Sequence, residues 1–524
     1  MKKLYSLLLL FFISGNATNY YVSQLTGIMS NDGLTPETAF LTLQQAHDIS
    51  QPGDVIFIMN GIYSNDNADS DILEIVISGT ENQWITYKNY EGHQPVLKLN
   101  ANNWQAVNIQ GADYIIIDGL KIIGNNDAIS LEYALSEQNN FDNAATSGNG
   151  IAISIEFDNQ ENKSHHVIIR NCTISKCGGG GIYSYHSDYI TIENNTVYEC
   201  AWYSPYNNSG ISMYQNWNSD NSLEIKNIIS GNTCYRNECY IPRLIEGVPT
   251  IIDGNGIVID DSRNTQFDSP LGAYLGKTYI INNVIFDNGA RGIHSYSSDN
   301  IIVSNNTLYK NCQSDDTQEG ELTAFDSSAI TYINNIVFPD VNIPPIAIYN
   351  IADLIVDYNL WAENSDLAAH FGTNTLIGNP DFVFPSTNPL EADFHLMPSS
   401  IAINSGSSTV APITDKDGNS RIDNVDLGAY EFQPNLNTIK IQDASFIIYP
   451  NPVKESLTIV FSENNSELVE ISIYNSLGQS IASSLKAIAN HSLTIPLNHL
   501  SNGIYYVTIS KNGKQIDTKK IIKI

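Results

Sequence analysis

The chain has 524 residues and a formal net charge of −31, from 56 acidic side chains against 25 Lys and Arg. Phosphate binding needs a basic surface, so this balance excludes a nucleic-acid partner. The stretch from Lys440 to Ile524 holds eight Lys and six acidic residues, so the negative charge lies in the preceding part of the chain. We expect most of these carboxylates only to keep an exported protein soluble.

Residues 1–17 have the pattern of a secretion signal peptide. Lys2 and Lys3 form a basic start, Leu4 to Ile13 an apolar stretch, and Ala17 ends a small-residue cleavage site. The apolar stretch is too short to span a bilayer, and nothing later in the sequence is long and apolar enough. We therefore expect an exported mature chain without a transmembrane segment.

A short helix is predicted near the new N-terminus. Thr42 to Ile49 has helical spacing, with Leu43, Ala46 and Ile49 on one stripe. The repeated segments that follow this helix in the sequence are typical of a solenoid. A solenoid needs a terminal cap over its open core, and this helix is the natural candidate.

The middle of the chain carries a loose repeat of about two dozen residues, typical of a solenoid. Each copy is a short β-branched run followed by Asn, at Asn171, Asn195, Asn232, Asn283, Asn306 and Asn335. A second series consists of Gly-Ile dipeptides that begin at Gly150, Gly181, Gly210, Gly256 and Gly292. Such coils cannot bury their apolar faces alone, so stacked coils share one continuous core.

Six cysteines lie within this repeat, and none has metal-type CxxC spacing. Cys177 and Cys200 follow matched apolar positions in adjacent coils, about 4.8 Å apart, which is within disulfide range. The alternative is a stack of buried thiols that behave as small apolar residues, and we favour it.

The two ends of this region resemble those of secreted right-handed parallel β-helix proteins of the pectate-lyase type. The opening match is Tyr21-Val22-Ser23, Asn31-Asp32-Gly33 and Pro52-Gly53-Asp54, and the closing match runs from Asp393-Phe394-His395-Leu396 to Asp426-Leu427-Gly428-Ala429-Tyr430-Glu431. The resemblance implies an all-β, right-handed parallel β-helix over residues 18–433. It is weak for activity, because one framework carries lyases, hydrolases and other proteins.

Residues 434–444 read as a linker, and residues 445–524 as a small separate β-sandwich. Alternating strands are expected at Leu457–Phe461, Val469–Tyr474, Leu493–Ile495 and Ile504–Ile509. Tyr449-Pro450-Asn451-Pro452, Asn502-Gly503-Ile504-Tyr505 and the basic tail resemble the C-terminal sorting domain of the type IX secretion system of Bacteroidetes. This resemblance implies the type IX machinery as a partner and a secreted or outer-membrane cell-surface protein. The alternative is a carbohydrate-binding sandwich.

The Gly-Ile dipeptides also predict an outward face, since alternate strand residues point to opposite sides. The fourth position after each Gly gives Ser154, Tyr185, Tyr214, Asp260 and Tyr296, and the second gives Ala152, Tyr183, Ser212, Val258 and His294. Aromatic rings on such a face suit sugar rings, and the alternative is plain ladder stacking. Long insertions that contain Trp202 and Arg243 are expected to build a cleft beside it.

The stretch from Asp253 to Asn264 suggests calcium, with Asp253, Asp260 and Asp261 as candidate ligands, because calcium prefers several oxygen ligands. The alternative is turn chemistry, with Arg263 paired to Asp261.

Exported acidic-sugar lyases need a base and a positive group, which here places a catalytic patch at Arg291, His294, Asp260 and Tyr214. A carboxylate near His294 is expected to favour the charged imidazole. The predicted polysaccharide contacts are Tyr183, Tyr185, His186, Tyr296, Arg243 and Trp202. A lyase is the leading hypothesis. A hydrolase that uses Asp260 and Asp261 is the second, and a non-catalytic glycan-binding or surface protein is the third.

Overall fold

The computed structural model describes residues 17–153, 163–245, 247–362, 372–422, 424–433, 446–461, 468–475, 479–488, 492–511 and 514–524. The chain divides into two units, Met1–Phe432 and Gln433–Ile524, and each is described by itself. The predicted signal peptide, apart from Ala17, and the predicted linker lie outside the described residues.

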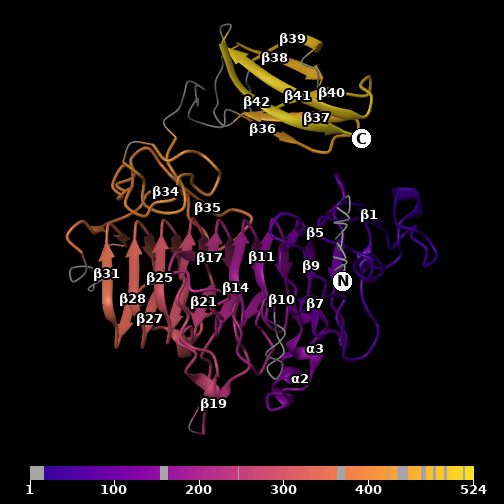
Figure 1. Ribbon diagram of the computed structural model, residues 1–524. Coiled ribbons are helices and arrows are strands. Elements are labelled where there is room, and N and C mark those ends of the chain that lie inside the picture. Colours follow the sequence, from indigo (N-terminus) through magenta and orange to yellow (C-terminus); the bar gives the residue numbers. More distant parts are fainter. Residues whose placement is uncertain are drawn as a thin grey trace, which may run out of the picture. The chain divides into compact units, whose positions relative to one another are not determined.

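The first unit is a right-handed parallel β-helix of three long sheets, whose strands stack coil upon coil (Figure 1). Sheet I contains β1 (Asn19–Val22), β2 (Val55–Ile58), β5 (Ile85–Asn89), β8 (Ile115–Asp118), β11 (His165–Arg170), β14 (Asp188–Glu193), β17 (Ile225–Ser230), β22 (Lys277–Ile281), β25 (Asp299–Ser304), β28 (Ser328–Ile333) and β31 (Ala352–Asp357).

Sheet II is formed by the strands of the Gly-Ile series and their neighbours. It contains β4 (Leu73–Ile75), β7 (Gln105–Ile109), β10 (Asn149–Ile153), β13 (Ile182–Tyr185), β16 (Ile211–Tyr214), β21 (Ile257–Asp260), β24 (Ile293–Tyr296), β27 (Leu322–Phe325) and β30 (Ile346–Tyr349). Ile182, Ile211, Ile257 and Ile293 are fully buried in the shared core, as the repeat predicts.

Sheet III closes each coil. It contains β3 (Ile62–Tyr63), β6 (Val96–Lys98), β9 (Lys121–Ile123), β12 (Thr173–Ser175), β15 (Thr196–Tyr198), β18 (Thr233–Tyr235), β23 (Val284–Phe286), β26 (Thr307–Tyr309), β29 (Ile336–Phe338), β32 (Leu360–Trp361) and β33 (Leu376–Ile377).

A ladder of asparagines fills the turn between sheets I and III. The amide oxygen of each accepts the backbone N–H of the Asn one coil earlier, as from Asn232 to Asn283 at 2.8 Å. The ladder comprises Asn195, Asn232, Asn283, Asn306, Asn335 and Asn359. The prediction was wrong for Asn171, because Cys172 occupies the ladder position and donates its N–H to Asn195. Asn171 instead lies one residue earlier, in a left-handed backbone conformation.

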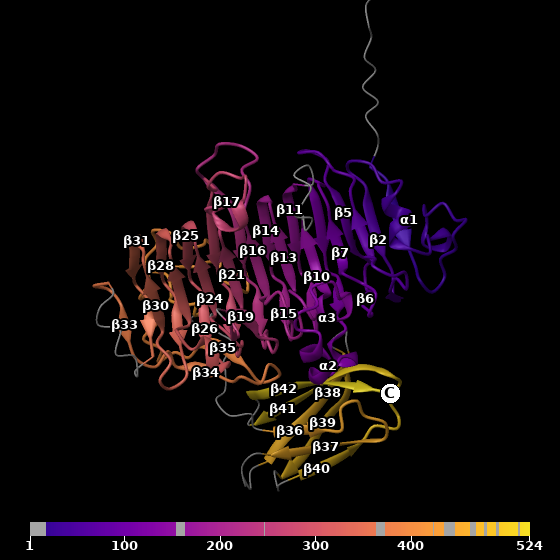
Figure 2. The same cartoon turned by 90° about the horizontal axis from the view of Figure 1, so that it is seen from below.

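The predicted helix is α1 (Leu43–His47), which lies at one end of the stack beside β2 (Figure 2). Thr42 and Gln45 form a capping box, in which the side chain of each accepts the backbone N–H of the other. The helix buries Leu43, Ala46 and His47. Ile49 was wrongly placed on the buried stripe, since the helix ends before it and its side chain is exposed.

All six cysteines are buried and free. Cys177 and Cys200 lie in the main core, where they pack as the apolar residues of the favoured alternative.

Short elements interrupt the coils or join them. They are η1 (Pro36–Thr38), η2 (Asn126–Ala128), α2 (Leu131–Ser136), α3 (Ala144–Ser147), the antiparallel pair β19 (Arg243–Ile245) and β20 (Val248–Thr250), η3 (Gln266–Asp268) and η4 (Asp315–Thr317). The pair β19 and β20 projects from the coils (Figure 1).

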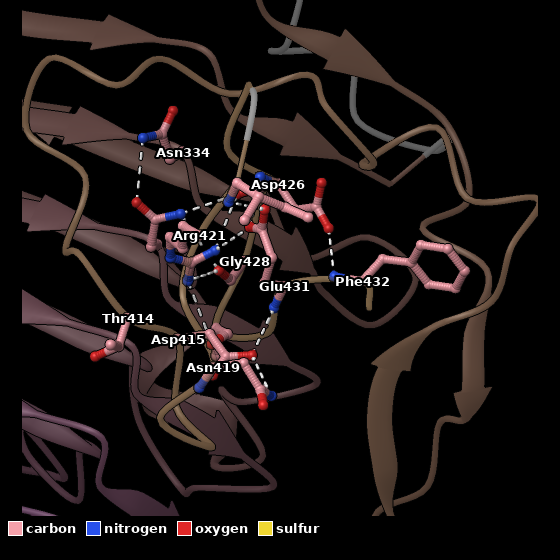
Figure 3. A network of polar contacts seen from close by, with 12 residues as sticks. Asn334, Thr414, Asp415, Asn419, Arg421, Asp426, Gly428, Glu431 and Phe432 are labelled. Atoms are coloured by element: carbon pink, nitrogen blue, oxygen red, sulfur yellow. Dashed lines mark hydrogen bonds and ion pairs between the residues drawn. The ribbon is translucent and has the colours of Figure 1, made fainter. Parts of the chain in front are cut away.

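The last part of this unit, with β34 (Phe382–Phe384) and β35 (Asp393–Leu396), packs against sheet III through a second apolar cluster. Its centre is an ion pair between Arg421 and Glu431, 3.0 Å apart and almost fully buried (Figure 3). Glu431 also accepts the backbone N–H groups of Ile422 and Asp426. The closing motif of the sequence therefore forms a buried polar network that holds the last part of the first unit in place.

The second unit consists of two antiparallel sheets. One contains β36 (Phe446–Tyr449), β37 (Ser456–Phe461) and β40 (Ser492–Pro496). The other contains β39 (Ser480–Ile488), β38 (Leu468–Asn475), β41 (Gly503–Lys511) and β42 (Lys514–Lys523). Leu457, Ile473 and Val507 belong to its own buried core. The sequence predicts β37, β38, β40 and β41, and it misses the other three strands.

Candidate functional site

The two outward rows predicted on sheet II are present in the described residues. The parallel register places Tyr185 opposite Tyr214, Tyr214 opposite Asp260, and Asp260 opposite Tyr296. The second row runs through Ala152, Tyr183, Ser212, Val258 and His294 in the same order. Ser154 lies outside the described residues. Two rows of side chains therefore line one face of the helix, although long insertions separate their strands in the sequence.

Asp260 is the carboxyl group at the centre of this face. Its side chain is partly exposed, and Gln266 donates a hydrogen bond of 2.8 Å to its Oδ1. Burial raises the pKa of Asp260 to about 8, and the nearby charges of Asp253 and Asp261 act in the same direction. A carboxyl group with this pKa holds its proton at neutral pH and can act as a general acid.

Asp261 has a different, structural role. It lies in a left-handed backbone conformation directly after β21. Its two carboxylate oxygens accept four hydrogen bonds of 2.8–2.9 Å, from Gln215 Nε2, from Gln266 N, and from both N and Oγ1 of Thr265. These contacts hold the loop that follows β21. The predicted alternative pairing of Arg263 with Asp261 was wrong, because Arg263 pairs with Asp299 at 2.8 Å.

Asp253 precedes β21 and accepts a hydrogen bond of 2.7 Å from Asn255. Burial raises the pKa of Asp253 to about 6, against the opposing charges of Arg291 and Arg243. Among the described residues no three His, Cys, Asp or Glu side chains come together to hold a metal ion. Both carboxylate oxygens of Asp261 already accept hydrogen bonds from the loop, and calcium binding by these three aspartates stays a prediction.

Arg291 lies at the corner before β24 and is only 6% exposed. Its Nη2 pairs with Glu319 at 2.8 Å, and its Nη1 donates to the carbonyl of Ile252 at 2.6 Å. Its Nε has no hydrogen-bond partner in the described part of the chain. The guanidinium is thus fixed near Asp253, whose carboxylate feels its charge, and its Nε–H is left without a partner among the described residues.

His294 lies on the same face as Asp260, in the next strand and opposite Val258. It is 6% exposed, and its Nδ1 is 2.6 Å from Oγ1 of Thr323. The expectation that a carboxylate favours the charged imidazole was wrong. Burial lowers the pKa of His294 well below its usual value, and the charge of Arg291 lowers it further. The imidazole is therefore neutral at pH 7.

The rings of this face differ in how much of them is open. Tyr185 is covered on both sides, by His186 at 3.6 Å and by Tyr214 at 5.5 Å between ring centroids. His186 is buried, and desolvation lowers its pKa to about 4. Tyr185 and His186 therefore follow the ladder-stacking alternative. Tyr296, in contrast, is 39% exposed.

The remaining two predicted contacts lie in insertions. Arg243 begins β19, and its charge acts on both Asp253 and Tyr214, so it belongs to the neighbourhood of Asp260. Trp202 instead packs in a small cluster with Tyr203 and Tyr240. The structure does not connect Trp202 to the centre of the face.

Sequence reasoning missed four residues that hold the site: Gln215, Gln266, Glu319 and Thr323. The first three lie in loops outside the strand pattern, so their spacing carries no signal. Thr323 lies in β27, whose first residue Leu322 follows Glu321 rather than Gly. A search for Gly-Ile dipeptides therefore stops one strand too early.

Comparison with known proteins supports both units. The family model of the right-handed β-helix region matches residues 105–337, and that of the secretion system C-terminal sorting domain matches residues 447–523. A search of curated proteins finds no match. Within the described residues, no helix is long and apolar enough to cross a bilayer.

Solved structures resemble this chain at low sequence identity and with TM-scores below 0.5. Pectate lyase Pel9A is 17% identical with a TM-score of 0.46, over 80% of this chain and 97% of that one. A rhamnogalacturonan lyase is 13% identical with a TM-score of 0.37, over 70% and 91%. The GH136 lacto-N-biosidase from Eubacterium ramulus is 13% identical with a TM-score of 0.37, over 69% and 68%. At these identities and TM-scores, the likeness carries no conclusion about this chain, and its chemistry is argued from its own residues.

Proposed function

We propose that this right-handed parallel β-helix protein, which carries a type IX secretion system sorting domain, is exported and acts on a polysaccharide at the sheet II face around Asp260. The observation that carries the proposal is the state of Asp260, a partly exposed carboxyl group whose pKa burial raises to about 8. Perturbed carboxyl groups on an accessible face are common in catalytic sites, and an acid that is protonated at neutral pH serves glycosidic cleavage.

The leading reaction is β-elimination on an acidic glycan. His294, which is neutral at pH 7, takes the proton from the carbon next to the sugar carboxylate. The electron pair forms the new C=C bond as the C–O bond to the leaving sugar breaks, and Asp260 gives its proton to the leaving oxygen. Arg291 and Arg243 supply positive charge beside the sugar carboxylate.

Hydrolysis is the second candidate, favoured by the pair Asp253 and Asp260. Burial raises both pKa values, to about 6 and about 8, so one group is ionised and the other protonated at neutral pH. A hydrolase uses one protonated and one ionised carboxyl group, and the ionised group is the general base in an inverting enzyme and the nucleophile in a retaining one. In this form of the site Asp253, rather than the Asp261 of the sequence hypothesis, partners Asp260.

The test is to incubate the purified protein with acidic glycans (polygalacturonate and alginate) and a neutral glucan. An unsaturated product that absorbs in the ultraviolet supports elimination, and new reducing ends without it support hydrolysis. Asp260→Asn is expected to abolish either signal, and Asp353→Asn, an exposed position on β31, is the control. Retention on a glycan without turnover by the wild type would reduce the proposal to a binding protein.

Calcium stays outside this mechanism and is tested separately. Isothermal titration of the wild type and of Asp253→Asn with calcium chloride measures whether the predicted ligands bind the ion. Binding that is lost in the variant supports the prediction, and no heat at millimolar calcium contradicts it.

A further inference from the structure

One aromatic side chain beside the candidate site is almost fully open to solvent. Phe267 lies in η3, within the loop that joins β21 to β22, and is 83% exposed. The other rings near Asp260 are less exposed, since Tyr185 and Tyr214 stack on neighbouring rings and Tyr296 is 39% exposed. A single exposed apolar residue needs no explanation by itself, so the case depends on how the loop holds this one.

The backbone at Phe267 is in the left-handed region, with φ of +49° and ψ of +37°. This conformation is uncommon for a bulky residue, and it persists only where the surroundings impose it. Here the backbone hydrogen bonds of the preceding residue, Gln266, hold this conformation. Its N–H donates to Asp261 at 2.8 Å, and its carbonyl accepts from Gln215 at 3.0 Å and from Ser269 N at 3.1 Å.

The same Gln266 ties the loop to the centre of the face. Its side chain donates to Oδ1 of Asp260 at 2.8 Å, and its Oε1 is 3.5 Å from the hydroxyl of Tyr214. Phe267 therefore directly follows a residue whose side chain is hydrogen-bonded to the proposed general acid. The carboxylate of Asp261 accepts four hydrogen bonds from Gln215, Thr265 and Gln266, and these bonds hold the loop against the end of β21.

We propose that Phe267 is a sugar-stacking residue, which packs its ring on the apolar C–H face of a pyranose unit bound next to Asp260. This inference rests on the proposed function and adds a substrate contact to it. An open ring fits this role, because stacking needs an uncovered face. The aromatic row on sheet I does not fit it, since Tyr114, His166 and Tyr189 stack on one another at 4.9 and 4.3 Å and cover their own faces.

The experiment compares three variants of the full chain on polygalacturonate and alginate. Phe267→Asn removes the ring but suits the left-handed backbone. Phe267→Tyr keeps the ring, and Leu390→Asn removes an exposed apolar side chain outside the site. Affinity electrophoresis measures retention, and initial rates give kcat and KM. Phe267→Asn should weaken retention and raise KM about tenfold with kcat nearly constant, as loss of uniform binding does. The other two variants should stay within about twofold of wild type.

The outcomes separate this inference from the function on which it rests. If the wild type neither binds nor cleaves the glycans, the proposed function and this contact fail together. If the wild type acts on a glycan and Phe267→Asn has an unchanged KM and retention, only the contact fails. The melting temperature provides the structural readout. It should not fall in Phe267→Asn, because a ring that is 83% exposed has little packing to lose, whereas a clear fall would assign Phe267 to packing and overturn the inference.

Discussion

Tyr214 and Asp260 stand directly opposite each other on β16 and β21, so a carboxyl group interrupts the row of phenol rings between Tyr214 and Tyr296. Burial raises the pKa of both side chains. Each is therefore neutral at pH 7, and these two side chains offer a hydroxyl and a carboxylic acid proton. In a chain with a net charge of −31, a neutral Asp260 removes one negative charge that would repel an acidic sugar.

The first prediction concerns the pH dependence of turnover. If Asp260 is the general acid, only its protonated form is active, so kcat/KM should fall as the pH rises through about 8. Asp260→Asn should reduce kcat about a hundredfold or more, the scale of general acid–base catalysis. The measurement is a pH–rate profile of both proteins. A wild-type profile that stays flat from pH 7 to pH 10 would remove Asp260 from this role.

The second prediction concerns His294 as the base. His294→Gln keeps a polar side chain of similar size and should reduce turnover about a hundredfold or more. Thr323→Val removes the hydroxyl next to Nδ1 without removing the ring, and its effect on turnover should be much smaller. Circular dichroism melting of each variant shows whether the fold is kept. Near-normal turnover in folded His294→Gln would place the base elsewhere on the face.

The outward face could be predicted from the sequence because one local signal fixes it. Each Gly-Ile dipeptide places an Ile in the core, and the two-residue period of a strand then determines which neighbours point outward. The register of Tyr214, Asp260 and Tyr296 follows from that rule alone. The prediction of the asparagine ladder was wrong at Asn171 because the ladder position is the next residue, Cys172. A shift of one residue is enough to move a side chain to the other side of the chain.

The electrostatic state of the site could not be predicted in this way. The pKa of His294 depends on desolvation and on Arg291, and the fixed position of Arg291 depends on Glu319. The loop contacts of Asp260 and Asp261 depend on Gln215 and Gln266, which lie outside the strand pattern. Such contacts arise from folding of the insertions, where sequence spacing contains no periodic signal.

The third prediction concerns the buried polar network around Arg421 and Glu431 at the end of the β-helix. Glu431→Ala leaves the buried guanidinium of Arg421 without its carboxylate, and loss of one partner of a buried pair costs about 3–5 kcal/mol. The matched control is Asp340→Ala, which breaks the more exposed pair with Lys310 and should cost at most about 1 kcal/mol. Urea denaturation measures both. Equal free energies of unfolding for the two variants would contradict a structural role for this polar network.

The fourth prediction concerns the second unit. Its two sheets have their own buried core, and a secretion system sorting domain matches residues 447–523. Deletion of residues 445–524 should leave the melting of the β-helix and its activity intact but prevent export, so the truncated protein should accumulate inside the cell envelope. Cell fractionation measures this. Normal surface display of the truncated protein would argue against the sorting role.

The fifth prediction concerns stability against pH at the end of the β-helix. The ring of His395 lies between two carboxylates, with Nδ1 2.6 Å from Asp393 and Nε2 2.8 Å from Asp417, and stacks on Tyr430 at 3.9 Å. Burial acts to lower the pKa of His395, but the hydrogen bonds and charges of Asp417 and Asp393 outweigh it and raise the pKa above its usual value of 6.5. A raised pKa in the folded state stabilises the protein fully below pH 6.5, and this stabilisation is lost as the pH rises through the folded value.

Melting temperatures from pH 5 to pH 9 should therefore fall more steeply for the wild type than for His395→Gln, and Asp417→Asn should show an intermediate slope. Identical slopes in all three proteins would mean that His395 does not titrate in this window.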